Sequence, residues 1–243
     1  MSTGDILARK VDMTSTYAEP PGEVSAPAGV YAPQSDSQLL IAAMHETGVV
    51  AGRRVADLCT GSGVVAISAA AAGAASVSAF DTSLRAVRCA RANVIAAGVD
   101  VGVHHGTWSL AAEFGRFDVV LCNPPYVPQP PGGDLCPIGS HAGPVAAYNA
   151  GADGRLVLDP LCAKAPDLLG SDGTLLLVHS EFSDVDATLA LLRHAGLKAA
   201  VIARQRVPFG PVLTARASWL EDVGRLEPGR REEELLVVRA DVP

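Results

Sequence analysis

Short runs of β-branched and other apolar residues alternate along this chain with longer segments of helical periodicity. This alternation is the feature that most restricts the fold, because parallel strands joined by helices form a sheet that is covered on both faces. Strands are predicted at residues 53–58, 76–80, 102–105, 117–122, 173–180, 199–203 and 234–239. Helices are predicted at residues 35–47, 63–72, 83–97, 154–169 and 184–195. We therefore expect an α/β three-layer sandwich around a seven-stranded, mostly parallel sheet.

The connection before the last predicted strand differs from the others. It is an insertion that runs from residue 204 to 232, with a turn at 208–211 and a short amphipathic stretch around Trp219 and Leu220. No crossover helix is predicted there, so we expect the last strand to insert antiparallel to its neighbours. A connection of this length is often functional.

Residues 1–29 follow neither hydrophobic period and are rich in Pro, Ser, Gly and Thr, which predicts a flexible N-terminal arm. Residues 30–243 are predicted to form a single domain, because 49% hydrophobic and 19% charged residues suit one globular core. The N-terminus does not resemble a secretory signal, and glycines interrupt the uncharged stretch 64–80. We therefore expect a cytoplasmic protein without a membrane segment.

The charge balance is acidic. Lys and Arg total 19 and Asp and Glu total 26, which gives a net charge of −7, and no basic run is longer than Arg230–Arg231. Tracking of a phosphate backbone needs clustered basic residues, so nucleic acid is disfavoured as a partner. None of the cysteines forms a CxxC pair, and no metal site is predicted; all are expected to be reduced core residues: Cys59, Cys89, Cys122, Cys136 and Cys162.

A glycine-containing turn follows the first predicted strand and leads directly into a helix. Cys59, Thr60, Gly61 and Gly63 lie in this turn, where glycine permits a tight bend and close approach of a ligand to outward-pointing amides. The turn predicts a nucleotide-type cofactor across the carboxyl ends of the strands. A dinucleotide fingerprint would need glycine at positions 59, 61 and 64, so Cys59 and Val64 disfavour a nicotinamide oxidoreductase.

Further candidates for this cofactor site end the first three strands. Asp57 is predicted to receive an amino acid end of the ligand, directly or through water, and Asp81 to accept hydrogen bonds from ribose hydroxyls. Thr107 and Trp108 would lie where the adenine of such a cofactor is expected. Thr107 offers a hydrogen-bond acceptor, and Trp108 offers a flat apolar wall. The structural alternatives are a helix cap for Asp81 and core packing for Trp108.

The fourth predicted strand opens into Asn123, Pro124, Pro125 and Tyr126. Two prolines keep this backbone stiff and extended, so the Asn123 side-chain oxygen and the Pro124 carbonyl can face one point. Two acceptors at one point suit a planar NH2 donor, and Tyr126 offers a face for that group. Asn123 is also placed beside the cofactor. The segment predicts methyl transfer to an amide or aromatic amine without a general base.

Other polar residues have weaker functional interpretations. His104 and His105 alternate along a strand and point to opposite faces, which is poor geometry for joint metal binding. His141 could line the mouth of the site or lie in a surface loop, and Asp153 could cap the following helix or lie on the rim. The acidic run 232–234 is interpreted as a solvated approach to the last strand.

Residues 30–203 and the last strand resemble the HemK-like branch of the class I methyltransferases, which methylate the side-chain amide of glutamine in proteins. The resemblance depends on residues 31–33 with 36–37, 57–63, Asp81, 123–127 and 150–155. It implies a Rossmann-like methyltransferase domain, S-adenosyl-L-methionine as cofactor, S-adenosyl-L-homocysteine as product, and a substrate such as a translation release factor. Cys59 and Thr107 depart from the family, which usually has glycine and often an acidic residue there.

About fifty residues precede the first strand, which is short for the helical recognition domain of the bacterial release-factor enzymes. The chain therefore resembles the short HemK-like branch, whose eukaryotic members use a small zinc-binding partner protein. Two other functions remain open besides the oxidoreductase. One is an RNA or DNA methyltransferase acting on an exocyclic base amine, which would need a basic channel. The other is a catalytically silent binding module, against which the intact segment 123–126 argues.

Overall fold

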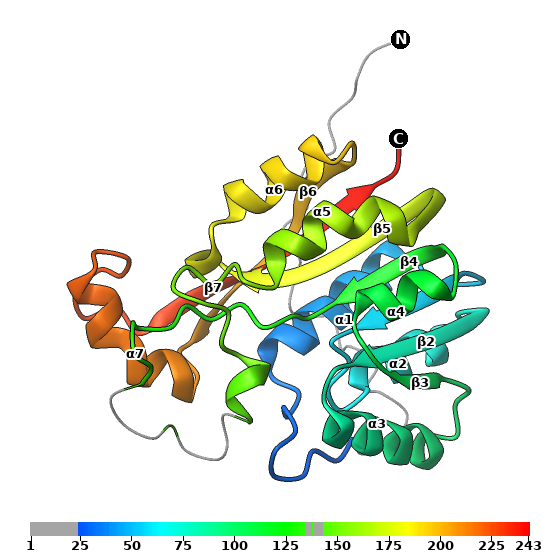
Figure 1. Cartoon of the computed structure of the whole chain (residues 1–243), viewed down its shortest axis with the longest axis horizontal. Coiled ribbons are helices and arrows are strands. Elements are labelled where there is room, and N and C mark those ends of the chain that lie inside the picture. Colours follow the sequence, from blue (N-terminus) through cyan, green and yellow to red (C-terminus); the bar gives the residue numbers. More distant parts are fainter. Residues whose placement is uncertain (1–23, 135–137, 139–142) are drawn as a thin grey trace.

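One sheet forms the centre of the molecule. The computed structural model describes residues 24–134, 138 and 143–243, and within them seven strands pair in the order β3-β2-β1-β4-β5-β7-β6 (Figure 1). The strands are β1 (Arg54–Leu58), β2 (Ser76–Asp81), β3 (Gly102–His105), β4 (Phe117–Cys122), β5 (Leu169–Ser180), β6 (Lys198–Pro208) and β7 (Glu232–Asp241). The predicted seven-stranded α/β fold is confirmed.

The strand directions place a crevice at one edge of the sheet. β1 pairs in parallel with β2 and with β4, β2 pairs in parallel with β3, and β4 does so with β5. The chain order therefore reverses between β1 and β4, and ligands of open α/β sheets bind outside the strand ends at such a point. β7 lies between β5 and β6 and is antiparallel to both, which confirms the expected direction of the last strand.

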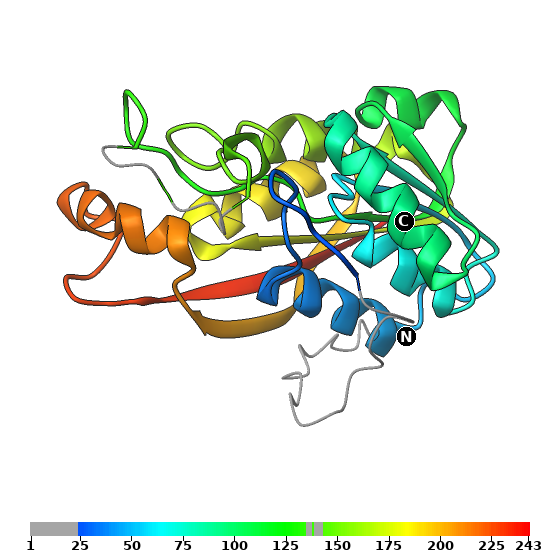
Figure 2. The same ribbon diagram turned by 90° about the horizontal axis from the view of Figure 1, so that it is seen from below.

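Helices cover both faces of the sheet. The first group is α1 (Ser35–Thr47), α2 (Val64–Ala71) and α3 (Leu84–Ala97), in which α2 contacts both of its neighbours. The second group is α4 (Trp108–Glu113), α5 (Leu158–Leu168) and α6 (Val185–His194), in which α5 contacts both of the others. Figure 2 shows α1 on one side of the sheet and α5 with α6 on the other. Strands covered in this way are buried on both faces, as in β4.

Some predicted boundaries are wrong. β6 was expected to end at residue 203, but it continues to Pro208 because residues 204–208 pair with β7. Exposed Arg204 and Arg206 alternate with less exposed residues there, so the segment lacks a continuous apolar run. α5 begins at Leu158 and not at 154, so Asp153 does not cap it; the Asp153 carboxylate accepts a hydrogen bond from the Arg155 amide instead. Helix α4 was not predicted.

The insertion contains a full helix, α7 (Pro211–Asp222), where only a short amphipathic stretch was expected. Its Arg216 is 2% exposed and forms a bidentate ion pair with Asp134, at 2.6 Å and 2.8 Å. The same guanidinium donates to the Pro128 carbonyl at 2.8 Å and to Asn149 Oδ1. Residues 127 and 149 form a β-bridge just beyond β4, so Arg216 fastens α7 to both strands of that bridge.

We predict that Arg216→Ala lowers the free energy of unfolding by about 3–5 kcal/mol, because it removes a buried cation and leaves Asp134 without its partner. Arg231→Ala is the matched control, since Arg231 forms an exposed ion pair with Glu221 and should cost at most about 1 kcal/mol. Urea unfolding followed by circular dichroism measures both. Equal small losses would contradict the role given to Arg216.

Candidate functional site

A cavity opens where β1, β2 and β4 end. Its lining contains all but one of the residues predicted to bind a cofactor or an acceptor: Asp57, Cys59, Thr60, Gly61, Asp81, Thr107, Trp108, Asn123, Pro124, Pro125 and Tyr126. These residues come from segments up to 69 positions apart in the chain (126 − 57 = 69). The sheet topology brings them together, because the carboxyl ends of parallel strands meet at one edge.

The residues of the turn after β1 have different structural roles. Cys59 and Gly61 have φ angles of 59° and 55°, in the left-handed region that costs a cysteine more than a glycine. A Cβ at Gly61 would meet nothing nearer than the Tyr31 carbonyl oxygen at 4.0 Å, so this position leaves space for a ligand. Gly63, at φ 86°, does not line the cavity; a Cβ there would lie 3.1 Å from the Ala90 Cβ. Gly63 therefore permits close packing of α2 on α3.

Two carboxylates organise the same turn. Asp57 is buried, and its Oδ2 accepts hydrogen bonds from Thr60 Oγ1 at 2.5 Å and from the Ala66 amide at 3.2 Å. Burial nevertheless raises the pKa of Asp57 to about 7. Asp81 Oδ2 accepts from the Gly61 amide at 2.9 Å, and burial raises the pKa of Asp81 as well. Asp57 Oδ2 has both lone pairs engaged by these two donors, whereas Asp81 Oδ2 keeps a second lone pair for a ligand donor.

The alternative assignment of Asp81 as a helix cap is not supported by the position of α3. The N-cap of α3 is Ser83, whose hydroxyl accepts from the Ala86 amide, whereas Asp81 Oδ1 accepts from the Ser83 amide at 2.8 Å. Thr107 is itself a helix cap, since its hydroxyl accepts from the Ser109 amide at 3.1 Å at the start of α4. Trp108 is partly buried against the core and also lines the cavity.

Asn123 is oriented by a residue from α1. Its Nδ2 donates to Ser37 Oγ at 3.2 Å. This bond makes the amide nitrogen the donor and turns Oδ1 into the available acceptor. No residue in the described part of the chain donates to Oδ1.

The hydroxyl of Tyr126 is held by a buried carboxylate. Asp36 is 3% exposed, and its Oδ2 accepts from Tyr126 at 3.1 Å and from Tyr31 at 2.8 Å. Asp36 Oδ1 accepts from the Ser37 amide at 2.6 Å. Burial and the neighbouring Asp36 charge raise the pKa of both tyrosines well above the usual value. Both therefore remain neutral donors, and the Tyr126 ring is fixed beside Asn123.

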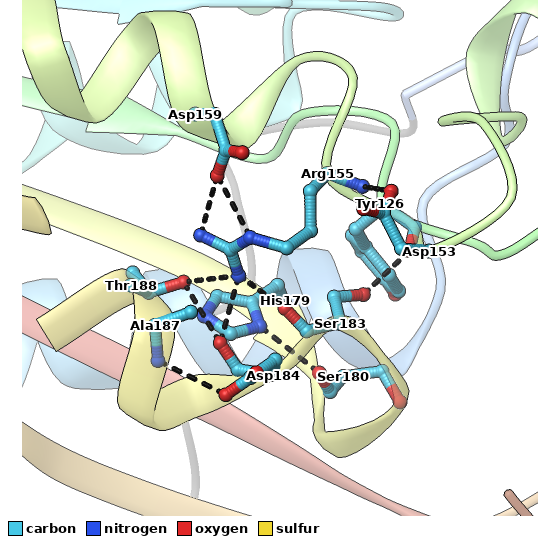
Figure 3. Close-up of polar contacts among 10 residues, drawn as sticks. All are labelled: Tyr126, Asp153, Arg155, Asp159, His179, Ser180, Ser183, Asp184, Ala187 and Thr188. Carbon is cyan, nitrogen blue, oxygen red and sulfur yellow. Dashed lines mark hydrogen bonds and ion pairs between the residues drawn. The ribbon is translucent and has the colours of Figure 1, made fainter. Parts of the chain in front are cut away.

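A second set of contacts holds the backbone of Tyr126 (Figure 3). Ser183 Oγ donates to the Tyr126 carbonyl at 2.6 Å. Arg155 Nη1 fixes the chain around Ser183 by donating to the carbonyls of Ser183 and Asp184 and to Thr188 Oγ1. The neighbouring residue is Gly154, at φ 80°, where a Cβ would overlap the Tyr126 carbonyl oxygen. The segment 154–155 and Ser183 therefore set the position of the Tyr126 carbonyl.

Sequence reasoning did not list Tyr31, Asp36 and Ser37 as site residues, although all line the cavity. The resemblance of segments 31–33 and 36–37 to the family pointed to these residues. It did not indicate what the segments contact. Ser183 and Arg216 gave no comparable signal, because the partner of Ser183 lies 57 positions away and those of Arg216 lie 67 or more positions away.

The remaining candidates have ordinary contacts or lie outside the described residues. His104 stacks on Phe80 at 5.2 Å, and His105 Nε2 lies 2.9 Å from the Thr82 carbonyl oxygen. The cysteines at 59, 89, 122 and 162 are free thiols; Cys136 and His141 are not described. Across residues 24–134, 138 and 143–243 we find neither a group of three side chains that could hold a metal ion nor a helix suited to crossing a membrane.

Comparison with solved structures agrees with this architecture. The Mtq2–Trm112 complex of E. cuniculi, described as responsible for methylation of the eRF1 translation termination factor, superposes with a TM-score of 0.60 at 20% identity, covering 88% of this chain and 99% of that one. The T. thermophilus 16S rRNA N2 G1207 methyltransferase gives a TM-score of 0.52 at 20% identity, over 87% and 44% of the two chains. The chain therefore has the class I methyltransferase fold.

Sequence comparison defines the family more narrowly. Residues 22–131 match the model of the methyltransferase small domain. A release factor glutamine methyltransferase of Xylella fastidiosa is 35% identical over 190 residues, 73% of this chain and 67% of that protein. A candidate protein N5-glutamine methyltransferase of Methanocaldococcus jannaschii is 29% identical, over 77% and 91% of the two chains. The chain belongs to the HemK-like family of protein glutamine methyltransferases.

We predict that Gly154→Ala is much more destabilising than Gly196→Ala. Both glycines have positive φ angles, 80° and 93°, so both variants incur the backbone strain of about 1–2 kcal/mol. Only at Gly154 does the added methyl group overlap a carbonyl oxygen, that of Tyr126, while nothing lies near Gly196. Chemical denaturation gives the two free energies of unfolding. Similar losses would mean that the Tyr126 carbonyl is not held tightly.

Proposed function

We propose that this chain transfers a methyl group from S-adenosyl-L-methionine to the side-chain amide nitrogen of a glutamine in a protein. The observation that carries the proposal is the hydrogen bond from Asn123 Nδ2 to Ser37 Oγ, which leaves Asn123 Oδ1 as an acceptor in the cavity. A carboxamide NH2 carries two N–H donors, and the Pro124 carbonyl is the second acceptor in our assignment.

The residues of the cavity fit the proposed cofactor. The space beside Gly61, where a Cβ would meet no protein atom nearer than 4.0 Å, suits a ligand against the backbone. We assign the ribose hydroxyls to Asp81 and the amino acid end to Asp57 with residues 59–61. Trp108 is assigned to the adenine. The Thr107 hydroxyl caps α4 by accepting from the Ser109 amide and keeps its second lone pair and its O–H for the adenine edge, to which we assign it.

When bound, the cofactor supplies an electrophilic methyl group and is converted to S-adenosyl-L-homocysteine. The protein's part is to orient the acceptor. Asn123 and Pro124 bind both N–H groups, which favours a pyramidal nitrogen whose lone pair points at the methyl carbon. Tyr126 supports the plane of the amide. The new N–C bond forms as the S–C bond breaks, and the nitrogen then releases one proton to water.

A protein acceptor is supported by the relatives and by charge. The release factor enzyme of Xylella fastidiosa and a ribosomal protein uL3 glutamine methyltransferase of Bordetella pertussis, which is 39% identical over 51% of this chain and 42% of that protein, both carry protein substrates in their names. The net charge of −7 disfavours a nucleic acid. We propose a release factor as the first substrate to test, and a small partner protein by analogy with the complex of E. cuniculi.

We predict that Asp81→Ala weakens binding of S-adenosyl-L-methionine by about 1.5–3 kcal/mol, because it removes hydrogen bonds to the ribose and loosens the Gly61 amide. Asp100→Ala, at an exposed position, is the matched control and should bind as the wild type does. Isothermal titration calorimetry measures both. Unchanged affinity in Asp81→Ala would restrict Asp81 to a structural role.

We predict that Asn123→Ala lowers kcat by about 100- to 1,000-fold and leaves cofactor affinity nearly unchanged, because Asn123 faces the acceptor. Ser37→Ala should lose less, since it removes only the bond that orients Asn123. Single-turnover transfer and calorimetry separate the two effects. Loss of cofactor affinity in Asn123→Ala would contradict the assigned geometry.

The identity of the acceptor is tested with a labelled methyl donor. We predict that incubation with separate pools of protein, RNA and DNA labels protein, and that mass mapping locates the label on glutamine, with release factors as the first candidates. The Asn123→Ala variant is the blank. Label that survives protease and disappears with nuclease would establish the alternative, methylation of an exocyclic base amine.

A further inference from the structure

A second cavity lies directly beside the first and shares five residues with it: Tyr31, Asp36, Tyr126, Val127 and Tyr148. We call it the flanking groove. Its outer wall is formed by the end of β6, the start of α7 and the start of β7, represented by Val207, Val212 and Glu233. Because Tyr126 and Tyr31 line both cavities, a polypeptide with one side chain beside Asn123 would bring neighbouring side chains to the flanking groove.

The wall of the flanking groove is fixed before any ligand binds. Arg216 fastens α7 to Asp134 and to the Pro128 carbonyl, and its guanidinium lies 5.4 Å from the centre of the Tyr148 ring. On the other side, both shared tyrosines donate to Asp36. A preformed groove loses little conformational entropy on binding, which favours specific recognition.

One carboxyl oxygen in the flanking groove lacks a hydrogen-bond donor among the described residues. Glu233 is 7% exposed, and its Oε2 accepts no hydrogen bond from the described residues. Burial raises the pKa of Glu233 to about 7; a hydrogen bond with Ser180 and the charge of Arg230 oppose this shift, and the nearby carboxylates of Asp36 and Glu181 add to it. A buried carboxyl oxygen without a donor is costly, so a ligand that brings a donor to Oε2 is favoured.

The cations near the flanking groove are engaged elsewhere. Arg230 pairs with Glu181, and Arg216 pairs with Asp134. Asp36 already accepts from two hydroxyls and an amide. Glu233 is therefore the carboxyl in the groove with unused acceptor capacity, and the net local charge is negative once it ionises.

The other walls are apolar, with Val212, Leu213 and Leu235 among the lining residues. An alkyl chain can pack on such a surface while its charged end reaches a carboxylate, which is how lysine and arginine side chains are commonly accommodated. Neither a purely apolar side chain nor an acidic one would satisfy Glu233.

We propose that the flanking groove binds a basic side chain of the protein substrate, close in sequence to the methylated residue, with its alkyl stem on Val212 and Leu213 and its cationic end at Glu233. The biological role of this groove rests on the proposed function: it would favour methylation of glutamines that have a basic residue nearby in the substrate. Its binding chemistry is independent of methyl transfer.

The test uses the full chain and a probe that cannot be methylated in the proposed reaction. Nα-acetyl-lysine methylamide and Nα-acetyl-norleucine methylamide, which keeps the alkyl chain and lacks the ammonium group, are titrated at about pH 8, where Glu233 is mostly ionised, and the carboxyl carbons of 13C-labelled Glu are followed by NMR. The lysine probe should bind at least about tenfold more tightly than the norleucine probe. Glu233→Gln should reduce that ratio to about twofold or less.

Glu234→Gln is the matched control, because Glu234 follows Glu233 and pairs with Arg204 instead; it should keep the wild-type ratio. Equal binding of the two probes to the wild type, a ratio that survives in Glu233→Gln, or absence of a saturable lysine-dependent shift would each overturn the proposal. Asn123→Ala should bind the lysine probe normally. Probe binding without glutamine labelling would refute the proposed function and leave the groove assignment intact.

Discussion

The site depends on one buried carboxylate, that of Asp36 at the start of α1. It accepts hydrogen bonds from the Tyr31 and Tyr126 hydroxyls and from the Ser37 amide, and the next side chain, Ser37, orients Asn123. A carboxylate with 3% exposure is tolerated only when its lone pairs are satisfied. Ser37 Oγ also donates to Asp36 Oδ1 at 3.3 Å, so the bonds that satisfy Asp36 hold both the Tyr126 hydroxyl and the serine that orients Asn123.

The rest of the fold supports this centre from separate directions. β4 supplies the backbone of the segment, Ser183 and Gly154 fix the Tyr126 carbonyl, and Arg216 brings α7 against the chain that follows. These contacts come from several different elements, so they hold the 123–126 segment rigidly. The glycine turn after β1, in contrast, leaves open space at Gly61. The insertion, through α7, lines the flanking groove beside the 123–126 segment, and β7 lines it as well.

The layout of the sheet and most of the cavity could be predicted from the sequence, because both follow from local patterns. Hydrophobic runs identify strands, and the carboxyl ends of β1, β2 and β4 carry Asp57, Asp81 and Asn123. What could not be predicted depends on distant pairing. Residues 204–208 become strand only through β7, and Asp36 meets Tyr126 across 90 positions. Gly63 carries the signal of a ligand turn, but its neighbour is Ala90.

The most direct test of this account is a crystal structure of the chain with S-adenosyl-L-homocysteine and a glutamine peptide. The account predicts that the glutamine amide nitrogen donates to both Asn123 Oδ1 and the Pro124 carbonyl, with its plane against Tyr126 and its lone pair directed toward the cofactor sulfur. An amide nitrogen bound elsewhere, or an Asn123 side chain that donates to the ligand through Nδ2, would contradict it.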